Sequence, residues 1–150
     1  MSMTGVQVVI FITFNAVYFA AAVMDLMTRE VYDFLWMIAV AISLGMFFTG
    51  PEVGMGEAAG LVIYVAVQEF VMARVYGRAD SHALCVCAMF LILFGKTVEV
   101  CIFHFAITFL LLTVVQSVRK NVDSRGMLKK KVAMVPYITV GLWITSAVFI

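Results

Sequence analysis

Residues 98–118 read VEVCIFHFAITFLLLTVVQSV, and this stretch decides the class of fold. Its single charged residue, Glu99, lies close to the start, and most of the remaining side chains are apolar. A helix rises about 1.5 Å per residue, so roughly 17–25 apolar residues cross the hydrocarbon core of a bilayer. Residues 98–118 are therefore predicted to form a transmembrane helix.

Five further apolar runs have a similar character: residues 5–24, 33–49, 57–75, 81–95 and 132–150. They are continuous rather than alternating, which favours helices over a β-barrel. The whole chain of 150 residues is 65% apolar and 13% charged, more apolar than a soluble domain of this size. We therefore predict one all-α domain, residues 1–150, with about six transmembrane helices, the fourth being the shortest. No basic residue precedes the first run, so we expect a retained helix rather than a signal peptide.

The basic residues are distributed very unevenly among the connections. Nine of the ten Lys and Arg residues fall in the first, third and fifth connections: Arg29, Arg74, Arg78, Arg119, Lys120, Arg125, Lys129, Lys130 and Lys131. The exception, Lys96, lies in the fourth. Short cytoplasmic loops are enriched in Lys and Arg, so these three connections are predicted to be cytoplasmic and both termini external. Membrane orientation and contact with anionic lipid account for the basic loop, so we expect no nucleic-acid partner.

Two aspartates flank the apolar runs on the predicted cytoplasmic side. Asp25 follows the first run and Asp80 precedes the fourth. Carboxylates from different helices at one depth can share a site, where two like charges resist joint ionisation and hold a proton between them. In an aspartyl protease, one such group takes a proton from water while the other hydrogen-bonds the substrate carbonyl.

Structural alternatives exist for both aspartates. Asp80, followed by Ser81, is a plausible N-cap for the fourth helix, and Asp25 could pair with Arg29 one turn later. The helix dipole favours an anion at a helix N-terminus and disfavours one at a C-terminus. On that basis Asp80 is expected to be the base and Asp25 the partner that carries the proton.

Three segments, in the right order and spanning nearly the whole chain, resemble motifs of the prepilin peptidases, the type IV leader peptidases. The first is MDLMTREV (24–31), similar to the family's segment around an aspartate after the first core helix. The second is GRADSHAL (77–84), similar to its glycine-rich motif that ends in a second aspartate. The third is VPYITVG (135–141), similar to its proline–aromatic entry to the last helix. The family's Gly-x-Gly-Asp is Gly-x-Ala-Asp here, His82 replaces a frequent lysine, and Tyr32-Asp33 replaces Pro-Asn.

The resemblance implies a polytopic aspartyl endopeptidase that removes leader peptides from type IV pilin-like or archaellin-like precursors at the cytoplasmic membrane face. It assigns the catalytic pair to Asp25 and Asp80. Gly77 would let the backbone approach the substrate closely. Larger members carry a cytoplasmic insert with cysteine pairs, linked to methylation, and this chain has no counterpart. It is therefore expected to be a peptidase of the minimal type.

Other polar residues near the predicted site have two interpretations each. His82 could bind substrate or tune Asp80, or be a solvated interfacial histidine. Glu69 could meet a basic leader peptide or simply pair with a neighbouring basic residue. His104, inside the fifth run, is expected to form a hydrogen bond between helices. Cys85, Cys87 and Cys101 form no C-x-x-C pair, so we expect buried thiols, no metal and no cofactor.

The alternative to a peptidase is a non-catalytic membrane protein, such as a small transporter or a pilus-assembly scaffold. A transporter is expected to place polar groups near the bilayer midplane. Asp25 and Asp80 are predicted at the interface instead, which favours proteolysis of a precursor protein at the membrane face. The sequence leaves the identity of the precursor and the oligomeric state open.

Overall fold

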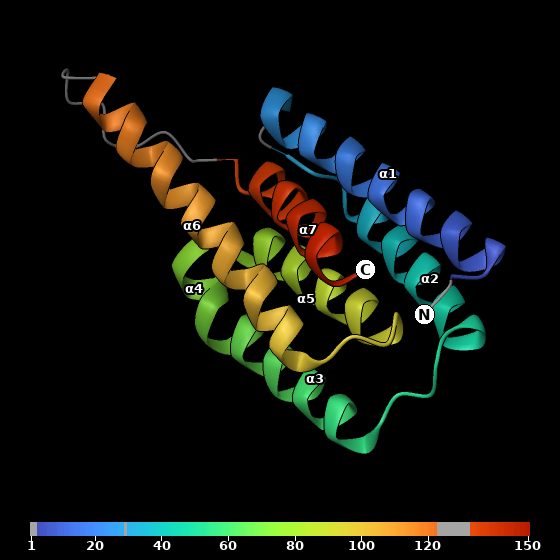
Figure 1. The fold of residues 1–150 in the computed structure, drawn as a ribbon. Coiled ribbons are helices and arrows are strands. Elements are labelled where there is room, and N and C mark those ends of the chain that lie inside the picture. Colours follow the sequence, from blue (N-terminus) through green and yellow to red (C-terminus); the bar gives the residue numbers. More distant parts are fainter. Residues whose placement is uncertain (1–2, 29, 123–132) are drawn as a thin grey trace.

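The fold is a helical bundle (Figure 1), seen in a computed structural model that describes residues 3–28, 30–122 and 133–150. The described residues form six helices and no strand. The third helix is continuous but contains a π-helical segment in its second half. The elements are α1 (Gly5–Thr28), α2 (Asp33–Thr49), the third helix made of α3 (Met55–Val67), η1 (Gln68–Met72) and α4 (Ala73–Tyr76), then α5 (Arg78–Leu93), α6 (Val98–Val122) and α7 (Val135–Phe149).

The six helices coincide with the six predicted apolar runs, so the all-α prediction is confirmed. Among the described residues, three helices are long and apolar enough to cross a membrane: Gly5–Thr28, Met55–Tyr76 and Val98–Ser117. Helices α2 and α7 are apolar but shorter. Sequence length and composition thus establish three candidate spans, rather than all six.

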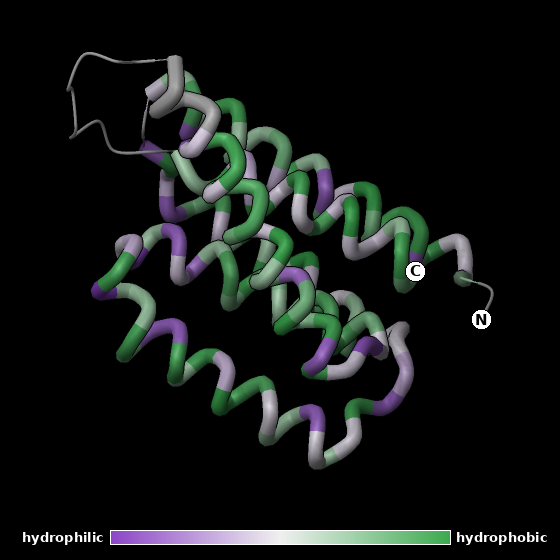
Figure 2. Tube along the Cα trace, turned by 60° about the vertical axis from the view of Figure 1, so that its left-hand side comes forward, coloured by the Kyte–Doolittle hydropathy of each residue, from purple (hydrophilic) through white to green (hydrophobic). Residues whose placement is uncertain are grey.

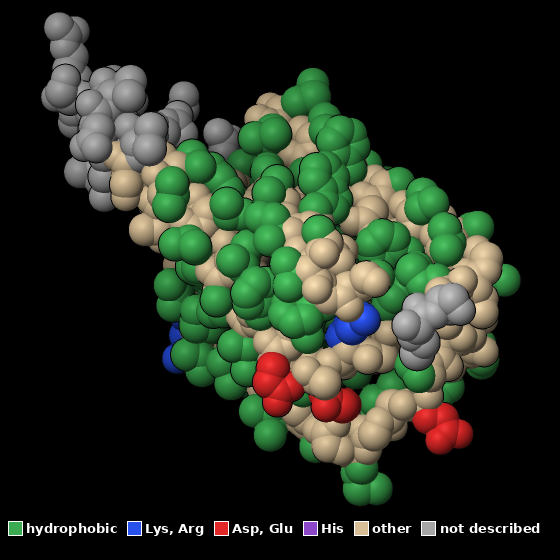
Figure 3. Space-filling model, viewed as in Figure 1, with side chains coloured by type: hydrophobic (Ala, Val, Ile, Leu, Met, Phe, Trp, Pro, Cys, Tyr) green, Lys and Arg blue, Asp and Glu red, His purple; other side chains and the backbone are tan. Residues whose placement is uncertain are grey.

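The bundle surface is apolar to an extent that a solvent-exposed domain would not tolerate. Hydrophobic residues prevail along the helices in Figure 2 and cover most of the face shown in Figure 3. Phe48 is 83% exposed, and no residue of α3 is buried within the described structure. This exposed apolar surface, like the three candidate spans, is compatible with a protein that lies in a membrane.

Helix α5 forms the centre of the bundle. It packs against α2, α7, α6 and the third helix, and ten of its sixteen residues are buried. In the last turn of α5, the ring of Phe90 stacks on that of Phe14 of α1, with 3.8 Å between the ring centroids. The shortest predicted run is therefore the core helix, enclosed by protein rather than by lipid.

Both ends of the described chain lie at the same end of the bundle. Met3 and Ile150 line one small cavity together with Lys96, and the Lys96 Nζ donates a hydrogen bond to the Phe149 carbonyl at 2.7 Å. The opposite end holds the C-terminus of α1 and the N-termini of α2, α5 and α7. Asp25 and Asp80 belong to that second end.

Helices α6 and α7 pack closely in the way that the sequence predicts for His104. Its Nε2 hydrogen-bonds the carbonyl of Ile138 at 3.1 Å, which confirms the predicted bond between helices. Beside it, a Cβ on Gly141 would lie 2.6 Å from the Thr108 Oγ1. Only a residue without a side chain allows this approach. The close contact fixes α7, whose first turn reaches Asp25.

Candidate active site

Asp25 lies in the last turn of α1 and is 8% exposed. Its Oδ2 accepts a hydrogen bond from the backbone N–H of Val135 at 3.0 Å, although 110 residues separate the two in sequence. Val135 is the first residue of α7, and Pro136 follows it. The first N–H groups of a helix have no partner within the helix, so the carboxylate of one helix caps the next. The pairing predicted between Asp25 and Arg29 lies outside the described residues.

Asp80 lies in the first turn of α5, three residues after Gly77. Gly77 is the N-cap residue, and its φ of 113° is a conformation that glycine adopts readily. A Cβ at Gly77 would lie 3.8 Å from the Asp80 Oδ2, so the turn and the carboxylate lie together. The alternative that Asp80 itself is the N-cap is wrong, because the helix begins earlier than the apolar run that predicted it.

The two aspartates influence each other electrostatically. Asp80 precedes the apolar run of α5, and burial raises the pKa of its carboxyl from its ordinary value of 3.8 to about 7. The charge of Asp25 is the second cause of the raised pKa. Like charges that influence each other in this way resist joint ionisation. The structure therefore places the two predicted residues within electrostatic range of each other.

The contacts of the two aspartates bear on which of them carries the proton. The backbone N–H of Val135 faces the Asp25 carboxylate and stabilises a negative charge there. Burial disfavours the charged form of Asp80. The contact with Val135 favours Asp25 as the base and Asp80 as the acid, the opposite of the assignment that the helix dipole predicts. The dipole argument considered the end of α1 without the N-terminus of α7 that meets it.

Tyr18 connects the helices that carry the two aspartates. It lies two turns before Asp25 on α1, is fully buried, and donates its hydroxyl hydrogen bond to the carbonyl of Ala83 on α5. Its own carbonyl accepts a hydrogen bond from the Thr139 Oγ1 of α7 at 3.2 Å. One residue therefore links α1, α5 and α7, the three helices that form the aspartate site.

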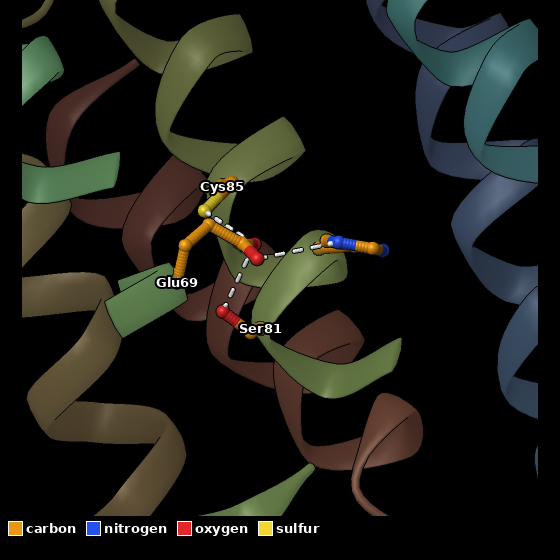
Figure 4. Close-up of polar contacts among 4 residues, drawn as sticks. Glu69, Ser81 and Cys85 are labelled. Carbon is orange, nitrogen blue, oxygen red and sulfur yellow. Dashed lines mark hydrogen bonds and ion pairs between the residues drawn. The ribbon is translucent and has the colours of Figure 1, made fainter. Parts of the chain in front are cut away.

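Glu69 is the centre of a second polar cluster, shown in Figure 4. Its Oε1 accepts hydrogen bonds from the Ser81 Oγ at 3.2 Å and the Cys85 Sγ at 3.8 Å. Its Oε2 lies 3.4 Å from the His82 Nε2, an ion pair when the histidine is protonated. The π-helical turn at Gln68–Met72 carries Glu69, and such turns frequently occur at functional sites. Among the predicted interpretations, Glu69 does pair with a neighbour, which is His82.

The five predicted site residues thus form two groups. Gly77 lies beside Asp80, and Asp25 is within electrostatic range of Asp80, whereas Glu69 pairs with His82. A cavity of about 680 Å³ is lined by Glu69 and His82 among others, and neither Asp25 nor Asp80 lines it.

Sequence reasoning missed Val135, Tyr18, Ser81 and Cys85 as members of these two groups. The seven-residue spacing of Tyr18 and Asp25, which places both on one face of α1, was a usable signal for one of them.

The chemistry available at the aspartate site is proton transfer by carboxyl groups. Among the described residues no set of three or more His, Cys, Asp or Glu side chains is arranged to hold a metal ion. A carboxylate pair activates water by taking a proton from it and needs no ion for that step. Comparison with protein-family models, curated proteins and solved structures finds no match in any of the three.

Proposed function

We propose that this chain is a membrane-embedded aspartyl endopeptidase that cleaves leader peptides from type IV pilin-like or archaellin-like precursors. The observation that carries the proposal is the electrostatic interaction between Asp25 and Asp80, which together with burial raises the pKa of Asp80 to about 7. The resemblance to the prepilin peptidases supplies the substrate class. The apolar bundle supports a location in the membrane.

The mechanism uses the two carboxyl groups in turn. Asp25, as the anion, takes a proton from a water molecule, and the hydroxide oxygen attacks the carbonyl carbon of the scissile peptide. Asp80, as the acid, gives its proton to the carbonyl oxygen as negative charge develops there. Collapse of this gem-diol intermediate breaks the C–N bond, and the proton held by Asp25 goes to the leaving amine. As the new carbonyl forms, one hydroxyl of the gem-diol returns a proton to Asp80, so Asp25 is again the anion and Asp80 again the acid.

The proposed topology has six spans with both termini external and the aspartates at the cytoplasmic face. It is supported by the nine basic residues in the first, third and fifth connections, and by the meeting of both described chain ends at the end of the bundle away from Asp25. The connection that holds Arg125 and Lys129 to Lys131 lies outside the described residues. A reporter fused after Arg125 should be cytoplasmic and one after Ile150 external. Both reporters on one side would contradict the six-span topology.

The decisive experiment is cleavage of a co-expressed pilin-like precursor by the wild type, Asp25→Asn and Asp80→Asn. Asparagine keeps the shape and part of the hydrogen bonding of aspartate but cannot carry the proton. Both variants should insert into the membrane and lose cleavage by at least about 100-fold, the scale of general acid–base catalysis. Glu52→Gln, an exposed acidic position at the other end of the bundle, is the matched control and should cleave normally.

Two outcomes would exclude the aspartyl mechanism. One is a fully active Asp80→Asn protein, which would also favour a non-catalytic role for the pair. The other is activity that a strong chelator removes and zinc restores, because a metal-activated water depends on the ion. Activity that survives the chelator and fails in both Asn variants is the expected result.

A further inference from the structure

A groove runs along α5 between α2 and the third helix. Helix α5 packs against both of these neighbours, and within the described chain α2 does not pack against α3 or η1. The space between them is the cavity of about 680 Å³, within the range of ligand sites. Its floor is formed by His82, Cys85 and Val86 of α5.

The walls of the groove change in character from one end to the other. On α2, the lining residues Asp33, Met37, Val40 and Leu44 follow one another at helical spacing, so they form a single stripe. On the third helix, Val65 and Glu69 lie one turn apart. The polar residues are thus confined to the end where α2 and α5 begin, and the apolar residues extend away from it.

Charge at the polar end is acidic. Asp33 is exposed in the first turn of α2, and Glu69 is 29% exposed across the groove from it. Among the residues that line the groove, His82 is the basic group, and its side chain is 50% exposed beside Glu69. A ligand complementary to these walls is apolar along its length and carries positive charge at one end.

We propose that this groove holds the apolar helix of the substrate, with the basic residues that precede that helix placed against Glu69 and Asp33. The inference rests on the proposed function, because it takes the substrate to be a membrane-inserted precursor. The polar end of the groove begins at His82, two residues after Asp80 on α5. A helix seated there would pass the segment that precedes it toward the aspartate site. Recognition and chemistry then occupy two sides of the same helix.

The position of Glu69 is fixed by its neighbours. Ser81 and Cys85 both donate to its Oε1, which leaves Oε2 directed to His82 at the groove. Glu69→Gln keeps an oxygen that accepts from Ser81 and Cys85 while it removes the negative charge. The variant therefore tests the charge of Glu69 with little change in shape.

The test is peptide binding to the full chain in lipid nanodiscs, carried out in the Asp80→Asn background so that no cleavage occurs. The probe is a helix of about 20 Leu and Ala residues, a length that spans a bilayer, preceded by two lysines. A second peptide with two glutamates in place of the lysines is the matched probe. A photo-crosslinker at position 44 reports on the groove, and one at position 102, on the exposed apolar surface of α6, reports on lipid-facing surface outside it.

The lysine peptide should crosslink at position 44 and not at 102, and should bind more tightly than the glutamate peptide. Glu69→Gln should weaken its binding by about threefold to tenfold, as expected for one partly buried charge pair, while Glu52→Gln leaves it unchanged. Equal crosslinking at both positions, lipid adducts alone at position 44, or no effect of Glu69→Gln would overturn the proposal.

Failure of the groove and failure of the peptidase give different results. Peptide binding at position 44 by a chain that cleaves no precursor would support the proposed binding groove and contradict the proposed peptidase activity. Leu44→Trp fills the groove from an exposed position. If cleavage depends on Asp25 and Asp80 but is unchanged by Leu44→Trp, the peptidase proposal is supported and the groove proposal is contradicted.

Discussion

The Asp25–Asp80 site and the Glu69 cluster lie at the same end of α5 but differ in enclosure. Asp25 is 8% exposed among α1, α5 and α7, whereas Glu69 is 29% exposed beside a groove of about 680 Å³. A group that exchanges protons benefits from burial, because burial shifts its proton affinity toward neutral pH. A group that recognises a ligand needs access. The adjacent residues Asp80 and Ser81 belong to different sites because neighbouring residues on a helix point in different directions.

The largest difference in stability is expected between Asp25→Ala and Asp25→Asn. Asparagine retains an acceptor for the Val135 N–H, and alanine does not. A buried donor without a partner costs about 1–3 kcal/mol. We therefore expect Asp25→Ala to lower the free energy of unfolding by about that amount relative to Asp25→Asn, measured by unfolding in detergent.

The loss in free energy of unfolding at position 25 can be compared with the loss caused by Glu69→Ala. Glu69 is partly exposed, so water can replace it as a partner for Ser81 and His82. Its removal should cost less than the change from asparagine to alanine at position 25. Equal losses at the two positions would show that the sites do not differ in enclosure as described.

The second prediction concerns the dependence of stability on pH. The pKa of Asp80 is raised from 3.8 to about 7, so between these values the folded chain binds more protons than the unfolded chain. The contribution of Asp80 to the free energy of unfolding therefore falls as pH rises from about 4 to 7, and the loss is complete above that window. Asparagine cannot ionise, so Asp80→Asn should be more stable than the wild type at pH 8, by about 1–2 kcal/mol after solvent screening, and equal to it near pH 3.

Thermal unfolding of both proteins at pH 8 and near pH 3 measures this difference. Cleavage should also decline above pH 7, since the acid form of Asp80 is lost there. A wild type that is more stable than Asp80→Asn at pH 8 would contradict the raised pKa.

Helix positions could be predicted well from the sequence because each apolar run is long and ends at a turn residue. The pattern could not show that residues 81–95 form the buried centre while residues 57–75 lie at the surface. In a membrane protein both lipid and protein interior select apolar side chains, so hydropathy does not separate them.

The candidate site could be predicted as a pair of aspartates but not in its details. Asp25 meets Val135 across 110 residues, and no local pattern encodes that contact. The contact favours Asp25 as the base, whereas the helix dipole alone predicts Asp80 in that role. Glu69 was singled out from the sequence, and its placement with His82 depends on how the π-helical turn of the third helix packs against α5. Long-range packing, rather than residue type, separates the two groups.

The third prediction tests whether Tyr18 acts on the aspartate site alone. Tyr18→Phe removes the hydroxyl that bonds the Ala83 carbonyl and keeps the ring between Phe14 and Trp36. Without this link, α1 and α5 hold Asp25 and Asp80 less firmly, and small misplacements of reacting groups reduce rates strongly. We expect kcat for precursor cleavage to fall about tenfold with KM unchanged. A rise in KM with kcat preserved would instead connect Tyr18 to substrate binding.

The smallest effect is expected for Ser81→Ala at the Glu69 cluster. The Ser81 Oγ is one of two donors to the Glu69 Oε1, and the Cys85 thiol remains after the change. A single hydrogen bond of this kind contributes about 0.5–1.5 kcal/mol, and a partly exposed acceptor such as Glu69 places it at the low end. Binding of the lysine peptide should therefore weaken by less than about threefold, with kcat unaffected. Ser43→Ala is the matched control, because Ser43 is buried and bonds a carbonyl of its own helix. A loss of cleavage in Ser81→Ala as large as in Asp80→Asn would mean that the two sites are one, and the separation of recognition from chemistry on α5 would have to be abandoned.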